Sequence, residues 1–318
     1  MSKSTELNSP LKVLLAGNPN SGKTSIFNKL TGNNQHVGNY PGITVEKRWG
    51  RVVNSEQAIE ILDLPGTYSL SSYSPEERIA QDALLESDYD IVVVVADSTN
   101  LKRNLLLLAQ VMQIGAKPVL CLNMTDEAER SGLELDIPQM EQLLGIQVVQ
   151  TVGHRGTGVE KLVEAIKRTA ATGERESRLV LGEKIDQGIK QIRVGLNIDS
   201  EERDRVDWIV TRLLVGDERI LNRIDDLGLD RELAQKLADE NRAYIEREVE
   251  RDISLFVTEQ YYGFVNGLLR EVVKTASKED ARALSDAIDS VVVHRFLGIP
   301  LFALIMYGIF WLTFTAGE

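Results

Sequence analysis

The stretch GNPNSGKT at residues 17–24 has the residue types and spacing of a phosphate-binding loop. It fits the pattern G-x-x-x-x-G-K-[ST], whose glycines let backbone N–H groups turn toward phosphate oxygens at the start of a helix. Lys23 is expected to reach the β- and γ-phosphates, and the Thr24 hydroxyl to bind Mg²⁺. The context agrees with this prediction, because an apolar strand at residues 11–16 precedes the loop and a helix is expected to open near Lys23.

Two further stretches carry groups that could act on the phosphates. In DLPG, at residues 63–66, Asp63 supplies a carboxylate for Mg²⁺ and Gly66 an N–H for the γ-phosphate. A loop rich in turn formers, predicted at residues 37–46, contains Thr44, which could complete Mg²⁺ coordination while the γ-phosphate is present and then let go. Lys23, Thr44 and Gly66 are therefore the predicted catalytic residues.

The stretch NMTD at residues 123–126 indicates which base is bound. The Asp126 carboxylate can accept hydrogen bonds from the N1–H and the exocyclic amine of guanine, a pair of donors that adenine lacks. Together the three motifs, in this order, predict a GTP-binding domain. The residues predicted to contact the nucleotide are Gly17, Asn18, Asn20, Ser21, Gly22, Lys23, Thr24, Ser25, Asn123, Met124, Asp126, Val152 and Gly153.

These motifs follow apolar runs that alternate with helical patterns over residues 1–170. The alternation predicts an α/β fold with a mostly parallel sheet covered on both faces and ligand loops at the carboxyl ends of the strands. Residues 171–290 are predicted to form an acidic, all-helical domain, since apolar residues recur there at helical spacing, for example between Phe264 and Val273. The excess of acidic residues is expected to form its solvated outer face.

Composition restricts the function classes. The formal net charge of −12 disfavours a nucleic-acid partner. The one cysteine, Cys121, lies in an apolar run and is expected to be a reduced, buried strand residue. The three histidines, His36, His154 and His294, are scattered, so no iron site is expected in this chain.

The last segment, residues 291–318, is predicted to contain a first transmembrane helix. Phe296 to Thr315 carry no charge, which matches the roughly 20 residues that a helix needs to cross a bilayer. His294 and Arg295 precede this run, as the positive-inside tendency requires of a cytoplasmic flank. The alternative is a buried core helix kinked at Pro300. The polar amino terminus has no signal-peptide pattern, so residues 1 to about 290 are expected to be cytoplasmic.

Taken together, GNPNSGKT, VGNYPGITVEK, DLPGTYSL and NMTDEAE resemble the amino-terminal part of the ferrous iron transport protein B (FeoB) family. The resemblance covers nearly the whole chain and implies a Ras-like P-loop G domain, a GDI-like or spacer helical domain and the start of a membrane region. It also implies that Asn20 helps to hold a potassium ion that stimulates hydrolysis. The metal ligands implied in this way are Thr24, Thr44 and Asp63 for Mg²⁺, and Asn20 for K⁺.

The sequence departs from the common G-protein patterns at three places. Thr67 stands where Ras-like enzymes carry the glutamine that orients water, which predicts slow intrinsic hydrolysis. Met124 stands where many G proteins have lysine, which predicts modest nucleotide affinity and fast exchange. The last guanine-loop motif, at residues 151–155, is degenerate, although the Gly153 N–H could still donate to guanine O6.

The resemblance implies a cytoplasmic module that binds and hydrolyses GTP and couples its nucleotide state to Fe²⁺ uptake at the bacterial-type inner membrane. The implied partners are a guanine nucleotide, the rest of a polytopic membrane domain and small accessory iron-transport proteins, and a homo-oligomer is allowed. Two alternatives stay open. One is a soluble potassium-activated GTPase of the Era or TrmE type acting in RNA modification or ribosome assembly. The other is a GTP sensor with negligible turnover.

Overall fold

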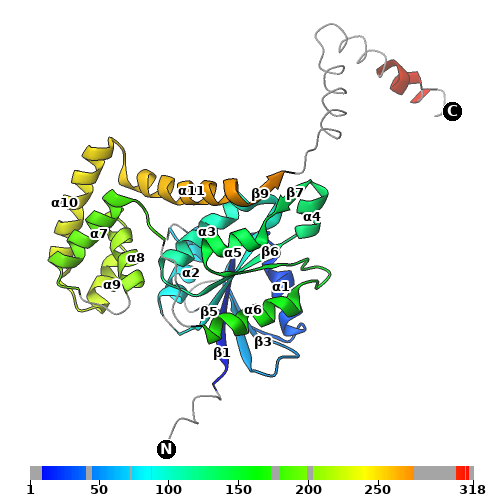
Figure 1. The fold of residues 1–318 in the computed structure, drawn as a ribbon, viewed down its shortest axis with the longest axis horizontal. Helices are drawn as coiled ribbons and strands as arrows, with labels where there is room; N and C mark the ends of the chain where they lie inside the picture. The colour runs from blue at the N-terminus through cyan, green and yellow to red at the C-terminus, as the bar shows by residue number, and fades with distance from the viewer. Residues whose placement is uncertain are drawn as a thin grey trace, which may run out of the picture. The chain divides into compact units, whose positions relative to one another are not determined.

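The computed structural model describes residues 9–40, 45–71, 74–86, 88–172, 179–198, 203–275, 306–311 and 313–314. It divides into two compact units, Met1–Val273 and Lys274–Glu318. The first unit contains the predicted phosphate and base loops, and most of its elements are labelled in Figure 1.

Within the described residues, a seven-stranded sheet forms the centre of the first unit (Figure 1). Its strands are β1 (Leu11–Gly17), β2 (Gln35–Asn39), β3 (Glu46–Arg51), β4 (Ile59–Asp63), β5 (Ile91–Asp97), β6 (Pro118–Asn123) and β8 (Gln147–Gln150), in the order β2-β3-β4-β1-β5-β6-β8. β4, β1, β5, β6 and β8 are parallel, and β2 and β3 pair antiparallel. The mostly parallel sheet is confirmed. The phosphate loop, DLPG and NMTD lie at the carboxyl ends of β1, β4 and β6, and these ends are on the same side of the sheet.

Helices cover both faces of this sheet, as the alternating pattern predicts. The helices and short elements of this part are α1 (Lys23–Thr31), α2 (Pro75–Leu85), η1 (Ser98–Asn100), α3 (Leu101–Gln113), α4 (Thr125–Arg130), β7 (Leu133–Leu135), α5 (Ile137–Leu144) and α6 (Val159–Ala171). Leu15, Val93 and Cys121 pack in the core under α1 and α6, whereas Leu14, Val94 and Leu120 pack in the core under α2, α3 and α5. Cys121 is buried as expected, and burial raises the pKa of its thiol to about 12.

One prediction in this part is wrong: residues 37–46 are not simply a loop. Residues 37–39 belong to β2, and β3 begins at Glu46. The pair lies at the edge of the sheet, where most side chains are exposed, so the strands lack the apolar alternation that would have indicated them. The exposed rings of His36 and Trp49 stack across the pair, with centroids 5.6 Å apart. Residues 41–44 lie outside the described residues.

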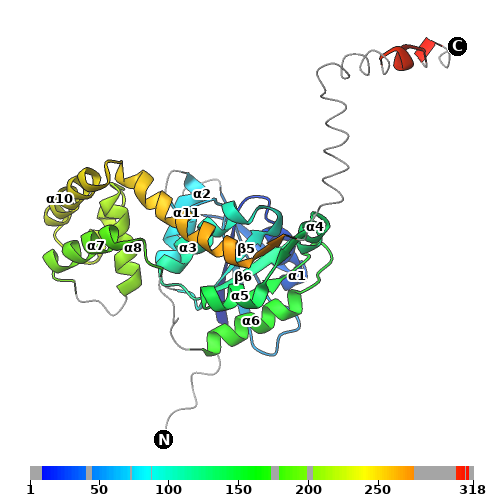
Figure 2. The same ribbon diagram turned by 45° about the horizontal axis from the view of Figure 1, so that its top comes forward.

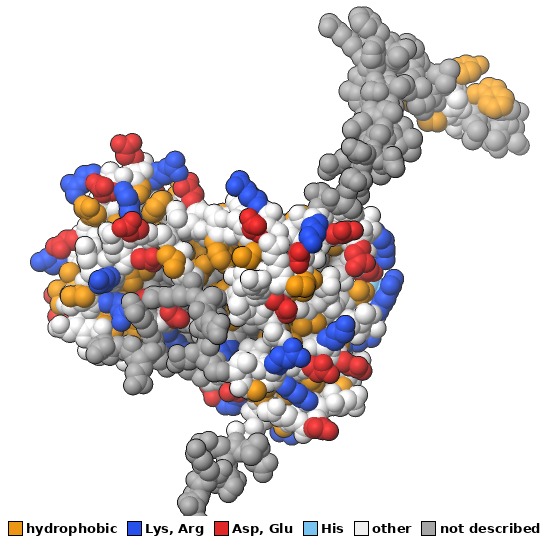
Figure 3. All heavy atoms as spheres, in the orientation of Figure 1, with side chains coloured by type: hydrophobic (Ala, Val, Ile, Leu, Met, Phe, Trp, Pro, Cys, Tyr) orange, Lys and Arg blue, Asp and Glu red, His pale blue; other side chains and the backbone are white. Residues whose placement is uncertain are grey.

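The predicted helical domain is confirmed over the residues that the structure describes. It contains α7 (Glu183–Gly195), α8 (Arg203–Leu214), α9 (Ile220–Asp226), α10 (Arg231–Val249) and α11 (Ile253–Val272). Trp208 is the largest fully buried side chain in it. Acidic and basic side chains lie together over its outer surface on the face shown in Figure 3, as expected for a solvated face.

α11 joins the helical domain to the G domain, and Figure 2 shows it reaching from the bundle to α3. The Tyr261 hydroxyl donates to Gln113 Oε1 of α3, and Gln113 Nε2 donates to the hydroxyl of Thr211 on α8 at 3.1 Å. Arg212 Nη2 donates to the carbonyl of Ser71 at 3.0 Å. Polar contacts therefore tie α3 and the segment after β4 to the helical domain.

The amphipathic pattern between Phe264 and Val273 is confirmed except at its end. Val265, Leu268 and Val272 are buried on one side of α11. A short strand, β9 (Val273–Thr275), begins at Val273, where the pattern predicts helix. Residues 276–290 of the predicted helical domain lie outside the described residues.

The predicted transmembrane helix falls largely outside the described residues. Of positions 296–315, the structure describes 306–311 and 313–314, which are helical, and Tyr307, Phe310, Trp311 and Phe314 are exposed there. Among the described residues, no helix combines the length and the apolar character needed to cross a membrane. The start of a membrane region is thus not confirmed.

Candidate nucleotide site

The predicted phosphate loop joins the end of β1 at Gly17 to the start of α1 at Lys23. Asn20 and Gly22 have positive φ angles of 65° and 81°, and the Ser21 N–H donates to the Asn18 carbonyl at 3.2 Å. Alternation of right- and left-handed backbone turns successive N–H groups to one side, which creates a concave anion site. The loop therefore has the backbone shape that phosphate binding requires.

Lys23 and Asp63 form a buried ion pair beside this loop. Burial raises the pKa of the Asp63 carboxyl, while the charges of Lys23 and Arg48 oppose the shift. The cation predicted for phosphate and the carboxylate predicted for Mg²⁺ thus contact each other in this structure. The two opposite charges compensate each other in a site that is nearly closed to water.

The segment after β4 packs against the phosphate loop. A Cβ on Gly66 would lie 3.3 Å from the backbone of Pro19, and the Thr67 N–H donates to the Gly17 carbonyl at 3.1 Å. The Thr67 hydroxyl donates to the Ser69 carbonyl at 2.6 Å. Thr67 is therefore engaged within its own segment, where Ras-like enzymes place a glutamine.

The structure describes only some of the other residues that are predicted to bind phosphate or metal. Thr24 and Ser25 lie on the first turn of α1 with exposed side chains, so the Thr24 hydroxyl is accessible. Thr44 lies outside the described residues.

Asn123, at the end of β6, connects the phosphate loop to the last guanine-loop segment. Its side chain is 2% exposed; Nδ2 donates to the Ser21 carbonyl at 2.9 Å, and Oδ1 accepts from the Gly153 N–H at 2.8 Å. The sequence predicts that Asn123 contacts the nucleotide, and in this structure its side chain braces two loops. The Gly153 N–H, predicted to meet guanine O6, is already donated to Asn123, and Val152 beside it is buried and pairs with Thr157.

Sequence reasoning missed Thr151, which supports this brace. Its buried hydroxyl lies 3.2 Å from Asn123 Oδ1 and 3.3 Å from the Leu122 carbonyl, and its own carbonyl accepts from the Thr125 hydroxyl at 3.2 Å. The only available signal was its position at the start of the degenerate stretch at residues 151–155.

Asp126 lies in the first turn of α4, after Met124, which has a left-handed φ of 60°. One carboxylate oxygen, Oδ2, pairs with Arg130 at 2.9 Å and with Arg155 at 3.7 Å. The other, Oδ1, is buried without a hydrogen-bond partner among the described residues. Asp126 Oδ1 is thus an acceptor without a described donor, on the residue that the sequence predicts to bind guanine.

The unpaired oxygens test whether these residues fit a nucleotide. Besides Asp126 Oδ1, the buried Asn18 Oδ1 and Ser21 Oγ of the phosphate loop have no partner in the described part of the chain. Buried polar atoms nearly always have a partner, so each one without a partner calls for a ligand, an ion or water. Their positions in the phosphate and base loops fit a bound nucleotide.

Gly22 offers a direct test of this geometry. A Cβ there would come closer to Asn123 Nδ2 than two atoms can approach, and φ is left-handed. We expect Gly22→Ala to lower the free energy of unfolding by about 2–4 kcal/mol in urea denaturation, through backbone strain plus displacement of Asn123. Gly228→Ala is the matched control, because Gly228 has φ of 68° and nothing within 4 Å of its Cβ position. Equal losses in both variants would show that Asn123 does not pack as described.

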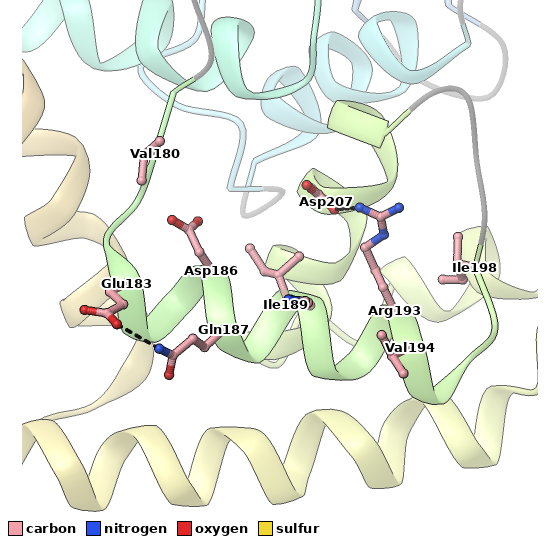
Figure 4. Close-up of a pocket in the computed structure, with 10 residues that line it drawn as sticks. Val180, Glu183, Asp186, Gln187, Ile189, Arg193, Val194, Ile198 and Asp207 are labelled. Atoms are coloured by element: carbon pink, nitrogen blue, oxygen red, sulfur yellow. Dashed lines mark hydrogen bonds and ion pairs between the residues drawn. The ribbon is translucent and has the colours of Figure 1, made fainter.

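Among the described residues, no group of three or more His, Cys, Asp or Glu side chains could hold a metal ion. A cavity of about 740 Å³ lies along α7, where Arg193 pairs with Asp207 at 3.0 Å (Figure 4). The residues lining this cavity all belong to the helical domain, so the predicted site residues do not contribute to it.

Comparison with known proteins agrees with this description. The family model for ferrous iron transport protein B matches residues 11–166, and that for the FeoB cytosolic helical domain matches residues 182–274. The chain is 38% identical to the Fe(2+) transport protein A/Fe(2+) transporter FeoB fusion protein of Porphyromonas gingivalis, over 97% of this chain and 37% of that one. It is 34% identical to the Fe(2+) transporter FeoB of Escherichia coli, over 96% of this chain and 39% of that one.

Solved structures agree as well. A GDP-bound mutant of S. thermophilus NFeoB superposes with a TM-score of 0.76 at 32% identity, covering 83% of this chain and 100% of that one. The cytosolic domain of the T. maritima FeoB iron transporter in its GMPPNP form gives 0.72 at 35% identity, covering 83% and 99%.

The fold, the phosphate loop and the NMTD loop define a P-loop protein with a Ras-like G domain followed by a helical domain. The chain belongs to the FeoB family. It spans less than two fifths of the length of the two curated relatives named above. These matches do not favour the alternative of a soluble RNA-acting GTPase of the Era or TrmE type.

Proposed function

We propose that this chain is the GTP-binding and GTP-hydrolysing cytoplasmic module of a membrane transporter for ferrous iron. The observation that carries the proposal is the brace at Asn123, which holds the phosphate loop and the guanine-loop segment together beside the unpaired Asp126 Oδ1. Relatives whose names describe Fe(2+) transport, and related cytosolic domains bound to GDP or GMPPNP, support the nucleotide and the cargo.

On the phosphate side, the backbone of residues 17–22 would cradle the β-phosphate. Lys23 would leave Asp63 for the β- and γ-oxygens, and the Gly66 N–H would meet the γ-phosphate. Thr24 and Asp63, with Thr44 from outside the described residues, would hold Mg²⁺, which neutralises charge on the phosphates. Binding thus exchanges one buried ion pair for two new charge contacts.

On the base side, Asp126 would accept from guanine N1–H and the exocyclic amine. No described group donates to its Oδ1, so guanine would displace no protein donor there, although the groups that bury this oxygen would have to move aside. Met124 packs near Gly22 and would contact the base without adding charge, which supports modest affinity and fast exchange. With Gly153 committed to Asn123, donation to O6 would need another group or a shift of this loop.

The rate of hydrolysis depends on which group does the work of the glutamine that orients water in Ras-like enzymes. Thr67 is bonded within its own segment and does not offer a substitute. We infer that K⁺, held with the help of Asn20, supplies the positive charge that an arginine finger supplies elsewhere. Without such help the intrinsic rate is slow.

Phosphate release by the purified 318-residue chain tests this function. We expect GTP turnover that is faster in K⁺ than in Na⁺, and loss of the difference in Asn20→Gly. Glycine is the preferred replacement because Asn20 has φ of 65°, which alanine would adopt only with strain. Turnover without any cation preference would remove Asn20 from the mechanism, whereas GTP binding with negligible turnover in K⁺ would favour the sensor alternative.

Residues 1–170 would be the GTPase domain, 171–290 the helical spacer and 291–318 the first transmembrane helix, with residues 1 to about 290 on the cytoplasmic side of the inner membrane. The partners would be the rest of a polytopic membrane domain and small accessory proteins. The fusion of a transport protein A to FeoB in Porphyromonas gingivalis supports the second partner.

A further inference from the structure

Arg103, in the first turn of α3, lies between two parts of the proposed site. Its guanidinium carbon stands 3.8 Å from the centroid of the Tyr68 ring, and its backbone carbonyl accepts from Asn18 Nδ2 at 3.3 Å. Asn18 belongs to the phosphate loop, and Tyr68 follows the Gly66-Thr67 segment. One residue therefore contacts both the loop that holds phosphate and the segment that meets the γ-phosphate.

The two contacts differ in strength. Asn18 is buried in the phosphate loop, so its hydrogen bond fixes that loop to α3. Tyr68 and the Arg103 side chain are exposed, and the hydrogen bonds on either side of Tyr68 belong to its neighbours: the Thr67 N–H donates to the Gly17 carbonyl and the Thr67 hydroxyl to the Ser69 carbonyl. Among the described residues, the stack on Arg103 is the contact that the Tyr68 ring itself makes.

α3 is a rigid base for this contact. Leu105, Leu107 and Leu108 are almost completely buried in the core against the sheet. Near the start of the helix, Asn104 Oδ1 accepts from the Asp97 N–H at the end of β5, and Asn104 Nδ2 donates to the Asn100 carbonyl. A side chain carried by such a helix can hold a loop residue in a defined position.

We propose that Arg103 is a positioning residue for the hydrolysis of GTP. Its stack on Tyr68 sets the position of Gly66 and Thr67 relative to the phosphate loop, and Arg103 does not itself touch the nucleotide. The proposal rests on the GTPase function proposed above. Because an exposed cation–π contact is weak, its loss should lower kcat by about two- to fivefold.

A double-mutant cycle tests the proposal in the purified chain. Arg103→Gln and Tyr68→Leu should each lower kcat for GTP by that factor, the double variant no further, and Kd for GDP should stay unchanged in all three. Tyr68→Phe keeps the aromatic face and should behave as the wild type, and Arg103→Lys should recover part of the rate. Lys102→Gln, which changes the neighbouring exposed cation, is the control for net charge.

Solution NMR gives a readout that does not depend on turnover. The Arg103 Hδ protons should show an upfield ring-current shift that persists in Tyr68→Phe and disappears in Tyr68→Leu. Additive rate losses, an unchanged kcat in Arg103→Gln, or equal behaviour of Tyr68→Phe and Tyr68→Leu would overturn the positioning role while leaving the GTPase standing. Absence of GTP turnover in the wild type would overturn the proposed function, and the positioning role with it.

Discussion

Asp126→Asn is expected to move base preference away from guanine and toward xanthine. Guanine offers donors at N1 and at the exocyclic amine, whereas xanthine carries a carbonyl at the amine position. An asparagine amide can donate to that carbonyl, but it leaves one guanine donor unpaired. Because a site built on buried hydrogen bonds rejects a ligand that leaves them unpaired by about 10⁴–10⁵-fold, we expect at least a 10²-fold loss of GDP affinity and a matching gain for XDP.

Titration with fluorescent GDP and XDP measures this change of base preference. The control is Arg130→Gln. Arg130 is exposed and pairs with Asp126 Oδ2, so its replacement leaves the other oxygen, Oδ1, as it is in the wild type. This variant should keep the preference for guanine. If Asp126→Asn binds GDP as the wild type does, Asp126 does not read the base.

Lys23→Met is expected to lower kcat for GTP by about 10²–10³-fold. Lys23 is the buried cation beside the phosphate loop, and removal of one preorganised charge-stabilising group costs about this factor in enzymes whose transition states gain charge. Phosphate release under saturating GTP measures the effect. Lys29→Met, on the exposed side of the same helix, should hydrolyse GTP at the wild-type rate.

Loss of folding could imitate this result, since Lys23→Met leaves Asp63 buried without its partner. Breaking a buried ion pair by removing one partner costs about 3–5 kcal/mol. The double variant Lys23→Met with Asp63→Asn carries no unpaired charge, so it should regain stability in urea denaturation and remain inactive. Wild-type turnover in Lys23→Met would show that this lysine does not act on the phosphates.

The sequence was most informative where chemistry and periodicity coincide. β1, β4 and β6 are buried apolar strands, each followed by a motif, so the strands and the shared edge could both be predicted. β2 and β3 could not, because strands exposed at the edge of a sheet have no core face to impose alternation. The end of α11 at Val272 was missed because the following residue is still apolar and continues the helical spacing.

Within the site, the sequence predicted which residues gather but not how they are bonded to each other. The types and spacing of Lys23, Asp63 and Asp126 indicate ligands for phosphate, metal and base, yet no motif shows that Lys23 and Asp63 pair in this structure. The bracing role of Asn123 and the stack of Arg103 on Tyr68 depend on contacts between distant segments. Such contacts follow from the folded sheet and cannot be read from local spacing.

The central claim is that the phosphate loop and the NMTD loop form one guanine-nucleotide site. The most direct measurement is the Kd of the purified chain for GDP and for ADP by isothermal titration calorimetry in Mg²⁺. We predict one site that binds GDP at least about 10²-fold more tightly than ADP, because adenine has no donor pair for Asp126. Equal affinities, or no binding of either nucleotide, would contradict this account.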